Sequence, residues 1–310
     1  SSDVCSSDLD GRRFDQCMGE LVAALDRIAD RSPAGTLRIA GGVLRTEFRA
    51  NWKVYLENVN DSVHPVTTHA SATLSARSVW GSPGETVVPP LAMRQLLPFG
   101  SGYQFFEQMG GRILPGGHSI LGTQQSLHTS YTGLGDYGEA LRAAHGEARA
   151  AEVLSFSPQN VVFYPTMALK GAPQVMRVLR PQAHDRTVVE AWAFQPEGAP
   201  DALLESALLY NRQVFSPLSL VAHDDLHLFE RIQQSLAAGP NDWVSLHREA
   251  RGEPADGARD AADEADAAAD GDPMPSGRRL AWRRYAGAVG ASVATMLLAS
   301  PLLQIGRAHV

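Results

Sequence analysis

The stretch RTVVEAWAFQP, residues 186–196, decides the fold. Its apolar side chains alternate, so that Val189, Ala191 and Ala193 fall on one face and Trp192 falls on the other. An alternation with a period of two residues predicts a β-strand. Two further strand candidates come before it in the chain, NVVFYPTMAL at 160–169 and QVMRVLRPQ at 174–182.

Farther towards the N-terminus, the patterns predict more strands. TEFRANWKVY, residues 46–55, alternates through Phe48, Ala50 and Trp52, and it runs into one or two helical turns in LENVNDSV, 56–63. Residues 87–128 are rich in Gly, Pro and short alternating apolar runs. This composition predicts antiparallel strands joined by turns.

Helical spacing of apolar residues predicts four helices, at 14–30, 137–156, 200–215 and 222–239. The order of elements is then helix, strands, helix, strands, helices. Such an order is typical of an α+β fold, in which helices pack on an antiparallel β-sheet.

The composition narrows the function. The chain has 310 residues, 44% hydrophobic and 20% charged, which fits a globular protein with a sizeable core, and we expect it in the bacterial cytoplasm. Its net charge of -7 equals the excess of acidic over basic residues between Glu253 and Asp272, a segment that contains eight acidic residues and one basic residue, Arg259. No basic footprint of a nucleic-acid binder is present. Two cysteines cannot form a disulfide framework, and Cys17 is expected to be a small buried residue.

The two ends of the chain are related to each other at the level of the encoding DNA. With one choice of codons, the DNA for residues 3–8 is the reverse complement of the DNA for residues 305–310. We interpret residues 1–9 and 305–310 as translated adapter sequence. Between them, the sequence predicts a folded domain at 10–250, an acidic disordered loop at 251–273 and a C-terminal helical, apolar tail at 274–304. Pro301 and the many small residues make this tail a poor membrane span.

The stretch ENVNDSVHPVTTHAS, residues 57–71, carries candidate chemistry. On one continuous helix, His69 would point about 140° away from His64, because five residues advance a helix by about 500°. Pro65 disfavours helical geometry at His64, so we expect the helix to end or kink there and let both imidazoles reach one ion. The stretch is then an iron site, a zinc site or a polar loop with two incidental histidines.

Two imidazoles leave a metal ion short of ligands, so a carboxylate is expected from elsewhere in the chain. AHDDLHLFERIQQ, residues 222–234, places Asp224 and Asp225 at the start of an amphipathic helix. We predict Asp225 as the ligand, with Asp224 capping the helix as an alternative role. Two histidines and one carboxylate form the facial triad of non-haem Fe(II) oxygenases.

NWKVYLENVNDSVHPVTTH at 51–69, followed by HDDLHLFERIQQSL at 223–236, resembles the catalytic domain of the large (alpha) subunit of Rieske non-haem iron aromatic-ring-hydroxylating dioxygenases. The resemblance implies a helix-grip, START-like fold. It also implies roles for five residues, in which His64, His69 and Asp225 bind mononuclear Fe(II), Asp61 is the electron-transfer bridge to the Rieske cluster of a neighbouring subunit, and Asn58 lies just outside the ligands.

The resemblance further implies an activity and partners. Members activate O2 to cis-dihydroxylate, or sometimes monohydroxylate, an aromatic substrate in aromatic hydrocarbon catabolism. Their electrons come from NAD(P)H through a ferredoxin or reductase and a Rieske [2Fe-2S] cluster, and their alpha subunits form trimers with or without a small beta subunit. The Cys-x-His and Cys-x-x-His pairs that hold the cluster do not occur here. We therefore expect a fragment that lacks the Rieske domain, does not bind the cluster, and is inactive alone.

Four apolar residues are candidates for the substrate pocket, and ordinary core packing is the favoured alternative for each: Phe163, Met167, Phe215 and Val221. Two other functions use the same sequence features. A zinc hydrolase would use the two histidines and the carboxylate to activate water. A non-catalytic relative would keep the fold without the metal. The remaining histidines are expected to be surface or core residues.

Overall fold

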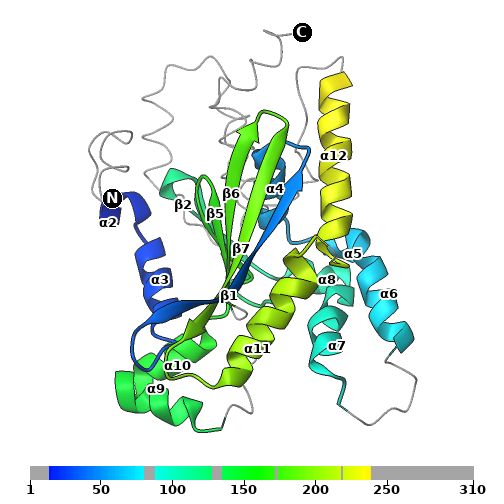
Figure 1. The fold of residues 1–310 in the computed structure, drawn as a ribbon. Helices are drawn as coiled ribbons and strands as arrows, with labels where there is room; N and C mark the ends of the chain where they lie inside the picture. The colour runs from blue at the N-terminus through cyan, green and yellow to red at the C-terminus, as the bar shows by residue number, and fades with distance from the viewer. Residues whose placement is uncertain (1–13, 80–87, 128–134, 172–173, 218, 239–310) are drawn as a thin grey trace.

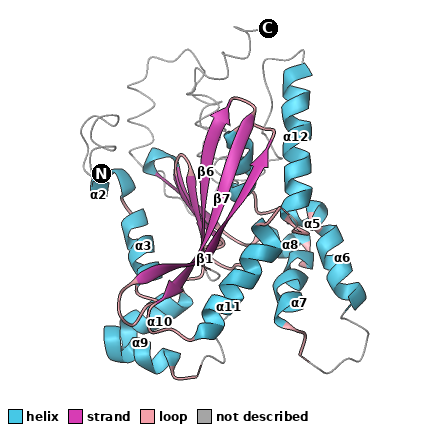
Figure 2. Ribbon diagram, viewed as in Figure 1, coloured by secondary structure: helices cyan, strands magenta, loops and turns pink. Residues whose placement is uncertain are grey.

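The computed structural model describes residues 14–79, 88–127, 135–171, 174–217 and 219–238. Seven antiparallel strands form one sheet in the order β1-β7-β6-β5-β4-β3-β2, with helices against it (Figures 1 and 2). The predicted α+β class is confirmed. The strands are β1 Leu37–Phe48, β2 Gly111–Leu114, β3 His118–Leu121, β4 Asn160–Phe163, β5 Met167–Lys170, β6 Val175–Ala183 and β7 Arg186–Pro196.

Strand β7 lies between β1 and β6, and its predicted alternation is confirmed. Val189, Ala191 and Ala193 are buried, whereas Trp192 on the other face is half-buried. The prediction of one strand over 160–169 is wrong, because the chain turns at Tyr164–Pro165 and makes two strands, β4 and β5. Pro165 has no N–H to give to a strand ladder, so a turn there costs no hydrogen bond.

The predicted strand over 46–55 is also shifted. Strand β1 ends at Phe48, and helix α4, Trp52–Asn60, begins where the alternation still continues. The side chain of Asn51 accepts a hydrogen bond from Lys53 N at 3.1 Å, which caps the helix and fixes its start.

Residues 87–128 are not all strands as predicted. Only β2 and β3 form there, while α7, Leu91–Leu96, and α8, Tyr103–Glu107, are helices. Each of these helices is too short to show a helical period clearly. Packing decides instead, because Leu96 and Phe106 lie in one buried cluster with residues of α6, Ala70–Val79.

Glycines divide two of the predicted helices. Gly19 has φ +49 and separates α2, Phe14–Met18, from α3, Leu21–Ala29. Gly146 has φ +83 and separates α9, Tyr137–His145, from α10, Glu147–Ser155. The expectation that Cys17 is buried is wrong, since it is only partly covered at the end of the short helix α2.

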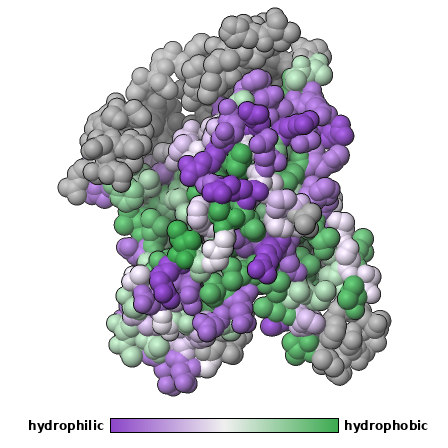
Figure 3. All heavy atoms as spheres, in the orientation of Figure 1, coloured by the Kyte–Doolittle hydropathy of each residue, from purple (hydrophilic) through white to green (hydrophobic). Residues whose placement is uncertain are grey.

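The sheet carries helices on both faces. Along β4, Val162 packs with Tyr55 of α4 and Phe229 of α12, Ala222–Ala238, whereas Val161 and Phe163 pack with α3 on the other face. A further helix, α11, Asp201–Tyr210, continues into the π-helical turn Asn211–Phe215, as the predicted helix over 200–215 requires, and both pack against β7. The upper ends of β6 and β7 carry hydrophilic side chains (Figure 3).

The predicted acidic loop, the apolar tail and both chain ends lie outside the described residues. Across the described ranges, none of the helices combines the length and the apolar character needed to cross a membrane.

Gly122 gives a test of the fold. It has φ +80, and a Cβ atom there would lie 2.6 Å from the backbone nitrogen of Gln159, which donates to Leu121 O. We expect Gly122→Ala to lower the free energy of unfolding by about 2 kcal/mol or more, measured by urea denaturation. Gly42→Ala is the matched control, because nothing lies within 4 Å of the added carbon. Equal stability of the two variants would contradict the strained turn.

Candidate metal site

The two histidines of the site lie at the ends of one short helix, α5, Pro65–Thr68. His64 precedes the helix with φ -52 and ψ -32, and His69 follows it with φ -102 and ψ 19. The predicted break in the chain is therefore real but misplaced. It falls at Asp61, which is extended with ψ 119, and Pro65 begins the next helix rather than ending one.

Asp61 holds this turn in place. Its Oδ1 accepts hydrogen bonds from Val63 N at 2.7 Å and from His64 N at 3.1 Å, and the residue is buried. A carboxylate that bonds the backbone two and three residues ahead stabilises a non-helical turn before a helix. Asp61 therefore has a local structural role in addition to the bridging role that the resemblance implies.

The third residue comes from α12. Ser219 Oγ accepts from Ala222 N at 2.6 Å and caps the helix, so Asp224 is not needed as its cap. Within α12, all of whose residues are described, Phe229 is the one buried residue. Its ring lies 5.5 Å from Phe48 and 5.8 Å from Tyr55, and this contact fixes the helix one turn after Asp225.

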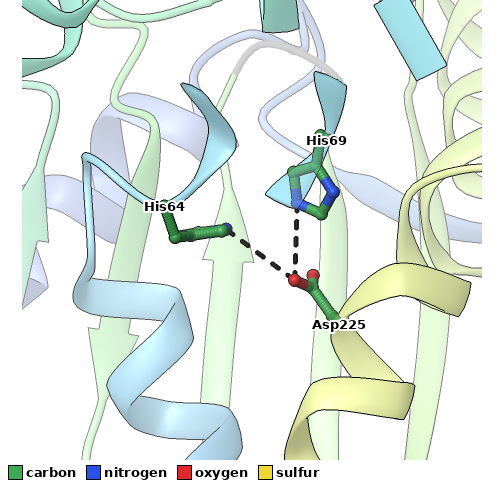
Figure 4. A group of neighbouring side chains, drawn as sticks. All are labelled: His64, His69 and Asp225. Atoms are coloured by element: carbon green, nitrogen blue, oxygen red, sulfur yellow. Dashed lines mark ion pairs between the residues drawn. The ribbon is translucent and has the colours of Figure 1, made fainter. Parts of the chain in front are cut away.

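The structure brings His64, His69 and Asp225 together, as the sequence predicted (Figure 4). These three residues form the candidate metal group. Asp225 Oδ1 lies 3.4 Å from His69 Nε2 and 3.9 Å from His64 Nε2. One possible ligand atom from each residue lies within 4.8 Å of the others. Such a spacing is compatible with three atoms that each lie about 2.0–2.2 Å from one shared metal ion.

The far side of each imidazole faces a second carboxylate. His64 Nδ1 lies 3.9 Å from Asp61 Oδ1, and His69 Nδ1 lies 3.8 Å from Asp224 Oδ2. These separations exceed a hydrogen bond, but they set the direction in which each Nδ1–H would donate. A carboxylate behind a metal-binding histidine orients the ring and raises its basicity. Ser71 Oγ donates to Asp224 Oδ2 at 2.9 Å and holds that carboxylate.

Burial sets the protonation of the group. It lowers the pKa of His69 to about 3, with a smaller effect of the neighbouring His64, so the imidazole is neutral at ordinary pH. Burial also raises the pKa of Asp225 well above its usual value, and a hydrogen bond from Asn58 partly opposes the shift. A desolvated carboxylate beside neutral imidazoles is an environment that favours a bound cation.

Asn58 lies where the sequence expected it, beside the group. Its Nδ2 donates to Asp225 Oδ1 at 3.1 Å and lies 3.1 Å from His64 Nε2. This hydrogen bond joins α4 to α12. A second contact between the same two helices, that of Tyr55 with Phe229, lies one turn away.

The four pocket candidates divide between the two faces of the sheet. Phe215 and Val221 belong to the cluster that contains Phe99, whose ring lies 5.6 Å from His69. Phe163 and Met167 pack instead with α3, on the face away from the metal group. Their positions in β4 and β5 point them to the opposite face, so for these two the favoured alternative, ordinary core packing, agrees with the structure and the pocket role does not.

Sequence reasoning missed Phe99 and Ser71. Phe99 lies in a segment predicted as strands, and no sequence signal linked it to His69. Ser71 lies only two residues after His69, so its proximity was readable but its partner was not. His118 and His145 contact backbone oxygens of Cys17 and Ser32, as expected of histidines outside the site.

Comparison with known proteins places this geometry in context. The family described as ring hydroxylating alpha subunit (catalytic domain) matches residues 36–259. Toluate 1,2-dioxygenase subunit alpha of Pseudomonas putida is 25% identical over 229 residues, 73% of this chain and 47% of the relative. Biphenyl dioxygenase subunit alpha of Paraburkholderia xenovorans is 26% identical over 229 residues, 71% of this chain and 46% of the relative.

Among solved structures, naphthalene 1,2-dioxygenase from Rhodococcus sp. bound to indole superposes with a TM-score of 0.53 at 20% identity, over 73% of this chain and 50% of that one. This likeness supports the fold. The chain spans about half the length of the curated relatives that it matches.

Proposed function

The chain belongs to the family of ring-hydroxylating alpha-subunit catalytic domains, and we propose from this that it carries the oxygenating centre of an enzyme that hydroxylates an aromatic ring. The observation that supports the proposal is the meeting of His64, His69 and Asp225, from segments more than 150 residues apart, within 4.8 Å. A group assembled from such distant segments and partly withdrawn from water is a costly arrangement unless it binds something.

The donor set fits iron. Two imidazole nitrogens and one carboxylate oxygen, with other positions left open, are the facial triad that non-haem Fe(II) oxygenases use. His64, His69 and Asp225 would hold the ion, and the ion would supply the redox chemistry with O2. His69 is 1% exposed, so the protein shields that side of the site from water.

The neighbours of the ligands have separate tasks in this proposal. Asn58 positions the carboxylate of Asp225 through its hydrogen bond. Asp61 faces His64 Nδ1, and Asp224 faces His69 Nδ1, so each carboxylate would orient one ring and leave its Nε2 available to hold the ion. Phe99, packed edge-on against His69, fixes that ring from the apolar side.

The complete enzyme would need electrons and partners. We propose that they reach the iron from NAD(P)H through a ferredoxin or reductase and the Rieske [2Fe-2S] cluster of a neighbouring alpha subunit, in a trimer with or without a beta subunit. Asp61, buried and directly behind His64, is the proposed bridge. Among the matched relatives, three are named for carboxylated rings, toluate, 2-halobenzoate and anthranilate, and one for an uncarboxylated ring, biphenyl, so the names alone do not fix the ring substituent.

Metal analysis and isotope labelling test this function. The full chain, reconstituted anaerobically with Fe(II), should bind about one ion per chain. With a chemical reductant, an aromatic substrate and ¹⁸O₂, it should give a ring product that carries ¹⁸O. Tight zinc binding with hydrolytic turnover and no ¹⁸O incorporation would establish a zinc hydrolase instead. Unchanged metal content after His64→Ala would indicate a non-catalytic relative.

Asp61→Asn separates the two roles of Asp61. Asparagine keeps an Oδ1 acceptor for Val63 N, so we expect the stability to change by less than about 0.5 kcal/mol. The charge that orients His64 is lost, and Fe(II) affinity should fall about 10-fold. Turnover with electrons from the Rieske partner should fall further than the affinity does.

Asp61→Ala is the control for the backbone role. It removes both backbone hydrogen bonds and should cost about 1–2 kcal/mol of stability. Wild-type affinity and turnover in Asp61→Asn would limit Asp61 to holding the turn.

A further inference from the structure

Two buried cations lie on adjacent strands of the sheet, outside the metal group. Lys170 ends β5 and Arg177 lies within β6, and each is 4% exposed. Lys170 shares a face of β5 with Ala168, and Arg177 shares a face of β6 with Leu179. Ala168 and Leu179 pack in the cluster that contains Phe229 of α12, so both cations lie on the face that carries the metal group.

The cations are poorly compensated within the described part of the chain. Neither forms an ion pair there, and Lys170 Nζ makes no hydrogen bond. Its Nζ lies 5.7 Å from the centre of the Tyr210 ring. Arg177 donates to Asn160 Oδ1 and lies beside the Tyr55 hydroxyl, while its buried Nε lacks a partner. Burying a charge without a counter-charge is costly, and burial together with Arg177 lowers the pKa of Lys170 well below its usual range.

Arg31 shows how this chain compensates a buried cation that serves structure alone. It is fully buried, and it donates to Gly171 O, Phe156 O and Ser157 Oγ. Arg177 has Asn160 Oδ1 as an acceptor and the Tyr55 hydroxyl beside it. Lys170 has no such acceptor among the described residues, which points to an anion that the chain itself does not supply.

The cations connect to the metal group through aromatic side chains. Arg177 Cζ lies 4.7 Å from the centre of the Phe215 ring, which lies 5.8 Å from Tyr210. Both rings pack in the cluster of Phe99, the residue in contact with His69. The positive charge of Arg177 also acts on Asp225, whose pKa it lowers against the effect of burial. Phe215 and Phe99, which pack in one cluster, thus connect Arg177 to His69.

We propose that Lys170 and Arg177 bind a carboxylate group of the aromatic substrate, whose ring lies against Phe215 on the way to the metal group. The inference rests on the proposed function, which it narrows from aromatic rings to aromatic carboxylates. A guanidinium fork matches the two oxygens of a carboxylate, and the ammonium adds a second charge. An anion there would supply the counter-charge that Lys170 lacks among the described residues, and it would add to the effect of Asp225 on Arg177.

A binding comparison tests the proposal on the full, metal-loaded chain under anaerobic conditions. Benzoate is the probe, and benzamide and methyl benzoate are neutral probes of similar shape. Calorimetry should show benzoate binding about 10- to 100-fold more tightly than either neutral probe. Equal affinities for the three probes would overturn the proposal.

Variants show which residues cause the preference for benzoate over the neutral probes. Lys170→Met and Arg177→Met should each reduce this preference about 10-fold or more, while Lys170→Arg keeps the charge and should retain the preference. Unchanged benzamide affinity shows that the pocket of each variant is intact. Lys53→Met is the matched control, because Lys53 is also buried but lies beside Trp52. This variant should prefer benzoate over the neutral probes as strongly as the wild type does. If both methionine variants still bind benzoate more tightly than the neutral probes by the wild-type factor, the assignment of the carboxylate site to Lys170 and Arg177 is overturned.

The outcome is separable from that of the proposed function. Oxygenation of neutral rings without a benzoate preference would refute the carboxylate and leave the oxygenase intact. A benzoate preference that depends on Lys170 and Arg177, in a chain that neither binds Fe(II) nor incorporates ¹⁸O, would refute the oxygenase alone.

Discussion

Asp225→Asn is expected to lower the affinity for Fe(II) by about 1000-fold or more, while the metal-free protein becomes more stable by about 1 kcal/mol. The loss follows because the carboxylate is the only charged member of the proposed ligand set, and an amide oxygen is a weaker ligand. The gain follows because Asp225 must be desolvated when it is ionised, and asparagine carries no such cost. Metal titration and urea unfolding without metal measure the two effects.

The stability gain should depend on pH. Burial raises the pKa of Asp225 above its ordinary value of 3.8, so the folded protein binds this proton more tightly than the unfolded chain does. The stability of the metal-free wild type therefore falls as the pH rises from about 3.8 to the raised pKa, and stays lower above it. The advantage of Asp225→Asn should grow across that window and then level off.

Asp224→Asn is the matched control for this variant. Asp224 is the neighbouring carboxylate, but it lies behind His69 Nδ1 rather than on the ligand side. Its replacement should reduce Fe(II) affinity by only about 10- to 100-fold. A larger effect at Asp224 than at Asp225 would show that the ligand assignment between the two is reversed.

Phe229→Ala is expected to cost about 3 kcal/mol or more in the free energy of unfolding. Phe229 is 3% exposed, and its ring packs against Phe48 of β1 and Tyr55 of α4. Because it is the one buried residue of α12, its loss leaves the helix without its main anchor. Asp225 lies one turn earlier, so we expect Fe(II) affinity to fall about 10-fold as well.

Leu228→Ala controls for helix composition. Leu228 lies beside Phe229 but is 42% exposed, so its truncation should change the stability by less than about 0.5 kcal/mol. Urea unfolding and Fe(II) titration of both variants check the prediction. Equal losses in the two variants would show that Phe229 is not the anchor of α12.

The sequence predicted several elements with a long, readable period, namely β6, β7, α11 and α12, each of nine residues or more. Length alone was not sufficient, since β1 with twelve residues was predicted in a shifted position and α6 with ten was not predicted. Segments with shorter patterns were misread. Helices α7 and α8 have six and five residues, so alternating runs there fit a strand equally well, and only packing against α6 decides.

The site divides in the same way. His64, His69 and Asp225 were predicted because their residue types, spacing and resemblance to a family all pointed to one metal. Asp224 was assigned to a helix cap, because its contact with Ser71 and its place behind His69 depend on how α12 lies against α6. Lys170 and Arg177 gave no signal, since a basic residue in a strand looks the same whether its end reaches water or the interior.

The helix between the two histidines has consequences for the lifetime of the protein. Four residues, Pro65–Thr68, cannot keep helical form on their own, because a single turn gains too few hydrogen bonds to offset the ordering of its backbone. In the proposed enzyme, both ends of that turn are tied to one ion, and the ion is tied to α12. Loss of iron would then release the segment to local unfolding and expose it to proteases. Iron supply would set not only the activity of the enzyme but also how long each copy survives in the cell.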